Sequence, residues 1–173
     1  GPADRLNPFI EGDPTMRVTL VTIAAACHSI NKAFCEANGD DSQPHWDNAP
    51  QWQRESAING VALHITDPHM SPAASHESWL AQKKREGWKF GKEKNPEKKT
   101  HPCYLPYDKL PAEQKAKDYL FKATVAAVRP LLAGNEFATA ADLAQKFHAA
   151  SAPTDSGKTD PDAQSVEKKT EPA

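Results

Sequence analysis

The chain has 173 residues, 38% of them hydrophobic, and a formal net charge of −2 at pH 7. This length and apolar fraction suffice for one modest core, which excludes two full-sized domains. A slightly acidic chain lacks the strong positive charge typical of nucleic-acid-binding domains, so we expect no specific nucleic-acid partner.

Apolar runs and cysteines bear on membrane association and on the cellular compartment. No stretch reaches the roughly 20 consecutive apolar residues that a membrane span needs, so we expect no membrane partner. The three cysteines are unevenly spaced, which favours a reducing compartment over a disulfide framework. The expected location is therefore the cytoplasm.

Both ends of the chain differ in composition from its middle. The opening Gly1-Pro2 resembles the remnant of a cleaved tag, so residues 1–16 are expected to be a flexible leader or tag-derived. Residues 151–173 are rich in Pro, Thr, Ser, Asp and Lys, so burial of apolar groups cannot offset the entropy of ordering them. We expect a disordered C-terminal tail and a folded domain over residues 17–134.

Two helices are predicted in the first half of this domain. Apolar side chains recur at helical spacing from Ile23 to Phe34, and an Asn-Gly pair follows, which predicts a helix over residues 18–37. The run Asn48-Ala-Pro-Gln is typical of a capped helix start. It predicts a second helix over residues 49–66.

A third helix and a pair of short strands follow. Ser71 before a proline is a typical start and Gly87 a typical end, which predicts a helix over residues 72–86. Two apolar-aromatic segments, residues 88–90 and 103–105, flank a polar loop and predict a small β-hairpin.

The last part of the domain is again helical. Leu110-Pro111 opens a long helix that ends between residues 130 and 134. A weaker pattern from Thr139 to Ala149 predicts a short helix within residues 135–150. The predicted class is mainly α, a compact helical domain with one short β-hairpin.

The segment from Ala74 to Tyr107 carries a specific frame of motifs. It contains H-E-x-W, then G-W-x-[FY]-G, then K-x-H-P-C-x-x-P-[YF]. This frame resembles the ryanodine receptor repeat, or RyR domain. The resemblance extends over about residues 17–133, and the HSINKAFC and GDDSQPHW segments are similar to prokaryotic and phage versions.

The resemblance implies binding rather than turnover. Receptor versions accommodate adenine nucleotides near the histidine and tryptophan of H-E-x-W, here His76 and Trp79. Prokaryotic versions occur around nucleotide-based defence signalling. Asn31 stands where a degenerate first repeat would have the matching tryptophan, so a base held between two indoles is not expected. A pocket shared between two copies, and hence a homo-oligomer, stays open.

The residues themselves offer two interpretations of the same helices. His76, Trp79 and Lys83 share one helix face; they could stack a purine and pair a phosphate, or Trp79 is a core residue with His76 as its hydrogen-bonded neighbour. His28 and Asn31 share a face at the edge of an apolar stripe. They could begin a pocket, or be internally satisfied polar groups.

Two loops complete the candidate site. Between residues 83 and 99, eight Lys or Arg face three Glu, which indicates an anion-facing lip or a merely solvated loop. The connection over residues 39–46 adds a glutamine and a tryptophan. The candidate ligand-binding residues are His28, Asn31, Gln43, Trp46, His76, Trp79, Lys83, Lys99 and His101.

No catalytic residue, metal site or cofactor is predicted. Cys27 and His28 are adjacent on a helix and point apart, and Cys103 near His101 lacks a third orienting group. The cysteines and histidines also lack close zinc-ligand spacing.

We therefore expect non-enzymatic binding of a nucleotide-derived small molecule of the ADP-ribose, NAD or cyclic-nucleotide type. Such a protein would act as a sensor or sequester a signal, as phage counter-defence in the host cytoplasm if the chain is phage-encoded. The alternative is a protein-interaction module without a small ligand. A third hypothesis is a hydrolase or transferase that uses the histidines on a nucleotide.

Overall fold

The computed structural model describes residues 17–95 and 97–150, so the predictions for residues 1–16 and 151–173 lie outside the described residues. The predicted class is confirmed, because the described chain is mainly helical with one pair of two-residue strands. Its α-helices are α2 (Leu20–Ala37), α3 (Gln51–Thr66), α4 (Pro72–Arg85), α5 (Ala112–Val128) and α6 (Glu136–Ala150). None of these helices is long and apolar enough to cross a membrane.

Local side-chain bonds start two of the helices. The Thr19 hydroxyl accepts a hydrogen bond from the Thr22 amide at the start of α2, at 3.2 Å. The Ser71 hydroxyl accepts from the Ala74 amide at the start of α4, at 3.0 Å. Each satisfies one of the first amides, which lack a partner within the helix.

The predicted cap of α3 is wrong. Asn48 belongs to a short 3₁₀ helix, η1 (Trp46–Asn48), and α3 begins only after Pro50, which makes no side-chain cap bond. The extended backbone of Ala49, the residue before the proline, separates the two helices.

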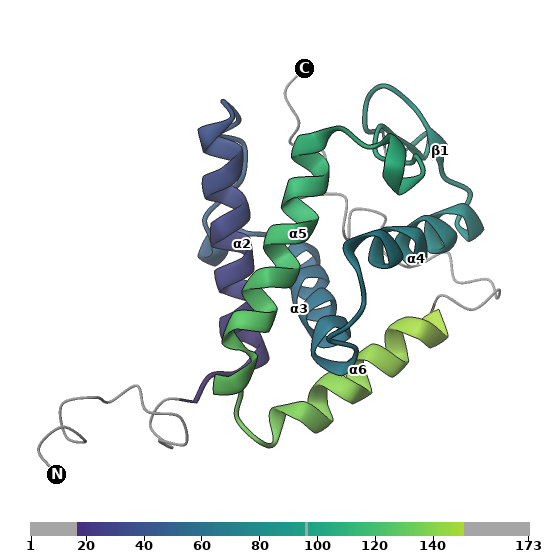
Figure 1. The fold of residues 1–173 in the computed structure, drawn as a ribbon. Coiled ribbons are helices and arrows are strands. Elements are labelled where there is room, and N and C mark those ends of the chain that lie inside the picture. Colours follow the sequence, from purple (N-terminus) through teal and green to yellow (C-terminus); the bar gives the residue numbers. More distant parts are fainter. Residues whose placement is uncertain (1–16, 96, 151–173) are drawn as a thin grey trace, which may run out of the picture.

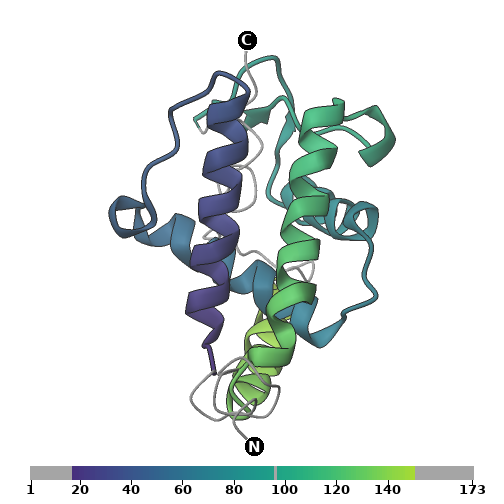
Figure 2. The same ribbon diagram turned by 60° about the vertical axis from the view of Figure 1, so that its left-hand side comes forward.

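The helices pack in two layers. In Figures 1 and 2, α2 and α5 lie side by side, and α3 crosses behind them. Helix α6 returns across α3 at the end where α2 begins, and α4 branches away on the other side of α5. A short 3₁₀ helix, η3 (Arg129–Leu131), links α5 to the segment before α6.

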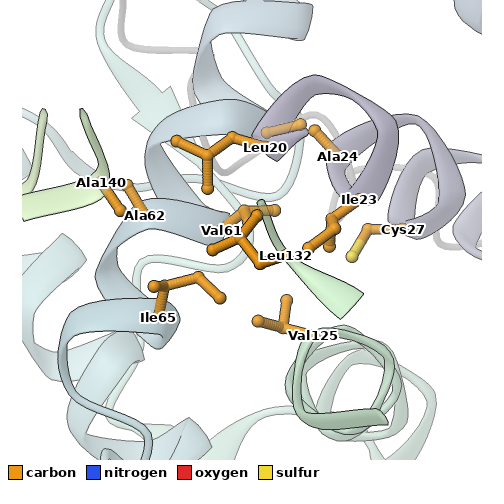
Figure 3. Close-up of a cluster of buried hydrophobic side chains, with 11 residues drawn as sticks. Leu20, Ile23, Ala24, Cys27, Val61, Ala62, Ile65, Val125, Leu132 and Ala140 are labelled. Atoms are coloured by element: carbon orange, nitrogen blue, oxygen red, sulfur yellow. The ribbon is translucent and has the colours of Figure 1, made fainter. Parts of the chain in front are cut away.

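The main core lies where α2, α3, α5 and α6 meet (Figure 3). Its members are small or branched aliphatic side chains, together with one cysteine, and we call it the aliphatic core. It consists of Leu20, Ile23, Ala24, Cys27, Ala57, Val61, Ala62, Ile65, Val125, Leu132 and Ala140. Ala140 comes from α6 and is fully buried, so this helix closes the core.

A second, smaller cluster lies between α4 and the segment that precedes α5. Buried Trp79, Cys103 and Leu110 form it, with Tyr104 and Tyr107 packed against them. We call it the aromatic cluster. Tyr107 begins a third 3₁₀ helix, η2 (Tyr107–Lys109).

The predicted hairpin needs correction. Strands β1 (Lys89–Phe90) and β2 (Thr100–His101) pair in parallel, not antiparallel, and β2 precedes the predicted segment 103–105. The intervening loop reverses direction twice, since Asn95 forms an antiparallel bridge with Thr100 before β2 runs alongside β1. The 103–105 segment turns instead, with the Leu105 amide donating to the Cys103 carbonyl at 2.8 Å.

Candidate ligand-binding site

A cavity of about 60 Å³ lies among α2, α3, the start of α4 and α5. Its buried wall includes the polar side chains of Asn31, His64, His76 and Lys117, whereas Ile30, 39% exposed, lies on its solvent side. The volume holds a few waters and is well below the roughly 150 Å³ cavity that takes a benzene ring. A larger ligand would therefore enter edge first, with its remainder in solvent.

Asn31 is the most unusual polar group in the wall. Its side chain is 8% exposed, and neither Oδ1 nor Nδ2 has a hydrogen-bond partner among residues 17–95 and 97–150. Leaving a buried donor or acceptor unmade costs about 1–3 kcal/mol. A buried amide at a cavity wall with both atoms unpaired is therefore a feature that calls for an explanation.

His64 presents a second such group from α3. It is 7% exposed, and its Nδ1 has no hydrogen-bond partner within the described chain. Burial lowers the pKa of His64 to about 4, and Lys122 adds to this effect while Asp118 and Asp67 oppose it. The imidazole is therefore neutral near pH 7, with one ring N–H and one acceptor nitrogen.

The opposite wall, from α4 and α5, carries charge. Lys117 is 6% exposed and lines the cavity next to Asp118. His76 also lines it, while its Nε2 lies 2.7 Å from the Leu105 carbonyl oxygen. The cavity wall thus combines an amide, a neutral imidazole and two oppositely charged residues, Lys117 and Asp118, with apolar side chains.

The structure brings two of the nine predicted site residues to this cavity, Asn31 and His76. His28 follows the lining residue Cys27 on α2 but does not itself line the cavity. Its Nε2 is 2.7 Å from the Pro44 carbonyl oxygen, and its ring packs against Trp46 at 5.7 Å. Burial is the main cause that lowers the pKa of His28.

Gln43 and Trp46 serve the connection between α2 and α3. The Gln53 side-chain amide donates to Oε1 of Gln43 at 3.0 Å, in a buried pair. Trp46 packs against the aliphatic core. Neither residue lines the cavity.

Trp79 and His101 are placed inside the aromatic cluster. Trp79 is 2% exposed, with the His76 ring 5.5 Å away on one side and His101 5.7 Å away on another. His101 is 1% exposed, and its Nδ1 accepts from the Cys103 amide at 2.9 Å. The indole of Trp79 does not line the cavity.

Lys83 and Lys99 converge on one glutamate instead of on the cavity. Lys83 is 1% exposed, with its ammonium 3.4 Å from the Glu86 carboxylate. Lys99 is exposed, holds a left-handed backbone with φ 56°, and donates to the Glu86 carbonyl at 2.7 Å. These contacts tie the end of α4 to the strand loop.

Most of the lining residues are absent from the sequence-based candidate set, among them His64, Lys117 and Phe121. The position of His64 inside the apolar run Val61–Ile65 is the only sequence signal for it, since a histidine there interrupts a buried stripe. Lys117 and Phe121 lie on a helix whose facing partner depends on tertiary packing. Among the described residues, no group of three or more His, Cys, Asp or Glu could hold a metal ion.

The geometry defines a small helical protein with a cavity between its helices, lined by apolar side chains and a few polar ones. Residues 69–135 match the family model of the RyR domain. No curated protein and no solved structure matches the chain. The match begins after α3 and ends before α6, so α2 and α3, which carry Asn31 and His64, lie outside it.

Proposed function

We propose that the chain binds a nucleotide-derived small molecule in the cavity among α2, α3, α4 and α5, without chemical turnover. The observation that carries this proposal is the Asn31 amide, buried in the cavity wall with Oδ1 and Nδ2 both unpaired among the described residues. A carboxamide offers one acceptor beside one donor, the pattern that pairs with the N6 and N7 edge of adenine.

The cavity volume supports edge-first entry of a base. About 60 Å³ admits the hydrogen-bonding edge of a purine but not a whole nucleotide. The sugar and phosphates would then remain on the solvent side.

Such a binder would act as a sensor of a nucleotide signal or would sequester it. The resemblance of the HSINKAFC and GDDSQPHW segments to prokaryotic and phage versions supports a cytoplasmic role of this kind, including counter-defence by a phage. The RyR match over residues 69–135 supports binding by this domain class.

Isothermal titration with AMP, ADP-ribose, NAD and a cyclic dinucleotide tests the proposal. Wild-type protein should give a saturable response to at least one of them, and Asn31→Leu should weaken it at least about 10-fold, as expected when a bidentate contact is lost. Asn59→Leu, on α3 outside the cavity wall, is the matched control and should bind like wild type.

Three outcomes would contradict the proposal. No response to any probe would favour the alternative, a protein-interaction module without a small ligand. Conversion of the bound probe, detected by mass spectrometry after long incubation, would favour the hydrolase or transferase hypothesis. Equal losses in Asn31→Leu and Asn59→Leu would remove the cavity as the site.

A further inference from the structure

Phe121 is the aromatic residue that lines the cavity. It comes from α5 and is half-buried, so part of its ring surface stays accessible. Trp79, the aromatic residue that the sequence favours, is 2% exposed and lies between two histidine rings. A ligand could stack on Trp79 only after the aromatic cluster opened, whereas Phe121 needs no such change.

The Phe121 ring packs closely against Gly60 of α3. A Cβ placed on Gly60 would lie 3.0 Å from Cζ and 3.4 Å from Cε1 of Phe121, so the tip of the ring rests directly on the α3 backbone. Only glycine leaves this space, since contacts near 3.0 Å require the neighbour to shift. Gly60 also lines the cavity, so a side chain there would press the ring toward it.

Two residues whose polar groups could bind the edge of a ligand, His64 and Asn31, line the same cavity as the Phe121 ring. The His64 imidazole is 5.7 Å from the Phe121 ring centroid, tilted by 47°. Asn31 faces the same cavity from α2. An aromatic side chain and two residues with unpaired hydrogen-bonding atoms, contributed by three helices, therefore line one cavity.

We propose that Phe121, seated on Gly60, is the surface on which the planar ring of the ligand stacks, while Asn31 and His64 hydrogen-bond the edge of that ring. The ligand class is a neutral planar heteroaromatic group with a donor and an acceptor adjacent on one edge. This inference rests on the proposed function and assigns the face contact within it. The stacking role thus falls to Phe121, at the contact between α3 and α5, and not to Trp79 on α4.

The test uses titration of the full chain with AMP, ADP-ribose and ribose 5-phosphate, which lacks the planar base. Phe121→Leu keeps an apolar side chain but removes the ring, and should weaken binding of AMP and ADP-ribose about 5- to 100-fold, the range measured for loss of one base-stacking side chain. Ribose 5-phosphate should bind weakly and equally to both proteins.

Gly60→Ala gives a second, independent variant. Alanine favours a helix over glycine, so the fold should be kept, while the displaced ring should narrow the cavity and weaken AMP binding. Phe90→Leu is the control, because Phe90 is an exposed aromatic residue on β1, away from the cavity. Circular dichroism checks that each variant is folded.

The outcomes separate this inference from the proposed function. Wild-type binding of AMP or ADP-ribose that Phe121→Leu leaves unchanged would overturn the stacking role and leave the proposed function in place. An equal loss in Phe90→Leu would do the same. A wild-type protein that binds neither probe would overturn both proposals.

Discussion

The aliphatic core and the aromatic cluster are stabilised by different kinds of contact. The aliphatic core consists of side chains such as Val61 and Ile65, whose burial is non-directional. The aromatic cluster surrounds Trp79 with buried histidines, and a buried ion pair between Lys83 and Glu86 lies at the end of the same helix. Such groups need particular partners at particular distances.

The cavity lies where these two regions meet. Cys27 belongs both to the aliphatic core and to the cavity wall, and His76 contacts Trp79 and also lines the cavity. The aromatic cluster also holds a buried polar atom without a hydrogen-bond partner in the described chain, Trp79 Nε1, but Trp79 does not line the cavity, whereas Asn31 and His64 do. Buried polar atoms without hydrogen-bond partners at a cavity wall therefore indicate a binding site more specifically than the burial of polar groups alone.

The largest expected effect is in the aromatic cluster. Trp79→Ala should lower the free energy of unfolding by about 4 kcal/mol, because it leaves a large cavity in a fully buried site. Urea denaturation followed by circular dichroism measures this. A loss below about 1 kcal/mol would mean that the cluster contributes little to the fold and that Trp79 is kept for another role.

A smaller effect is expected at the junction when the pH falls. The pKa of His64 is about 4 in the folded chain, against its usual value of 6.5. The unfolded state therefore binds more protons between these values, so the stabilisation is complete above pH 6.5 and is lost as the pH falls toward 4. Between pH 7 and 5 the loss should be about 2 kcal/mol.

Urea denaturation of wild type and His64→Gln at both pH values measures this difference. The variant should show a shallower dependence on pH, with a remainder from His28, whose pKa burial also lowers. An unchanged slope in His64→Gln would contradict the assignment of the effect to His64.

The smallest effect is expected in the aliphatic core. Ile65→Val removes one methylene group from a site that is 2% exposed, and should cost about 1 kcal/mol. AMP binding should stay at the wild-type level, since Ile65 does not line the cavity. A loss of more than about 3 kcal/mol in the free energy of unfolding would show that the aliphatic core depends on exact packing as much as the aromatic cluster does. This would contradict the proposed difference between the two regions.

Local signals in the sequence predict the helices well and the strand pairing poorly. Ser71 and Gly87 predict α4 because caps and stops act on neighbouring residues. The direction of β2 depends on how the loop around Asn95 turns back, and no local pattern specifies that path. The hairpin prediction therefore gave the wrong direction.

The site is predictable only in part for a similar reason. Asn31 can be found because it stands at a polar position beside an apolar stripe on its helix, and His76 because it belongs to the H-E-x-W motif. Phe121 and Lys117 follow apolar or charged patterns that are ordinary for an amphipathic helix. Their role depends on α5 facing α3, which only the packed structure shows.

The most direct test of whether the Asn31 amide serves a ligand compares the stability of Asn31→Leu and wild type without ligand, by urea denaturation at pH 7. Leucine has nearly the same shape as asparagine and removes two unpaired buried polar atoms. We therefore expect equal stability or a gain of about 1 kcal/mol in the free energy of unfolding, together with loss of nucleotide binding. A loss of more than about 1 kcal/mol would show that the amide serves the fold, and would contradict the claim that this cavity is kept for a ligand.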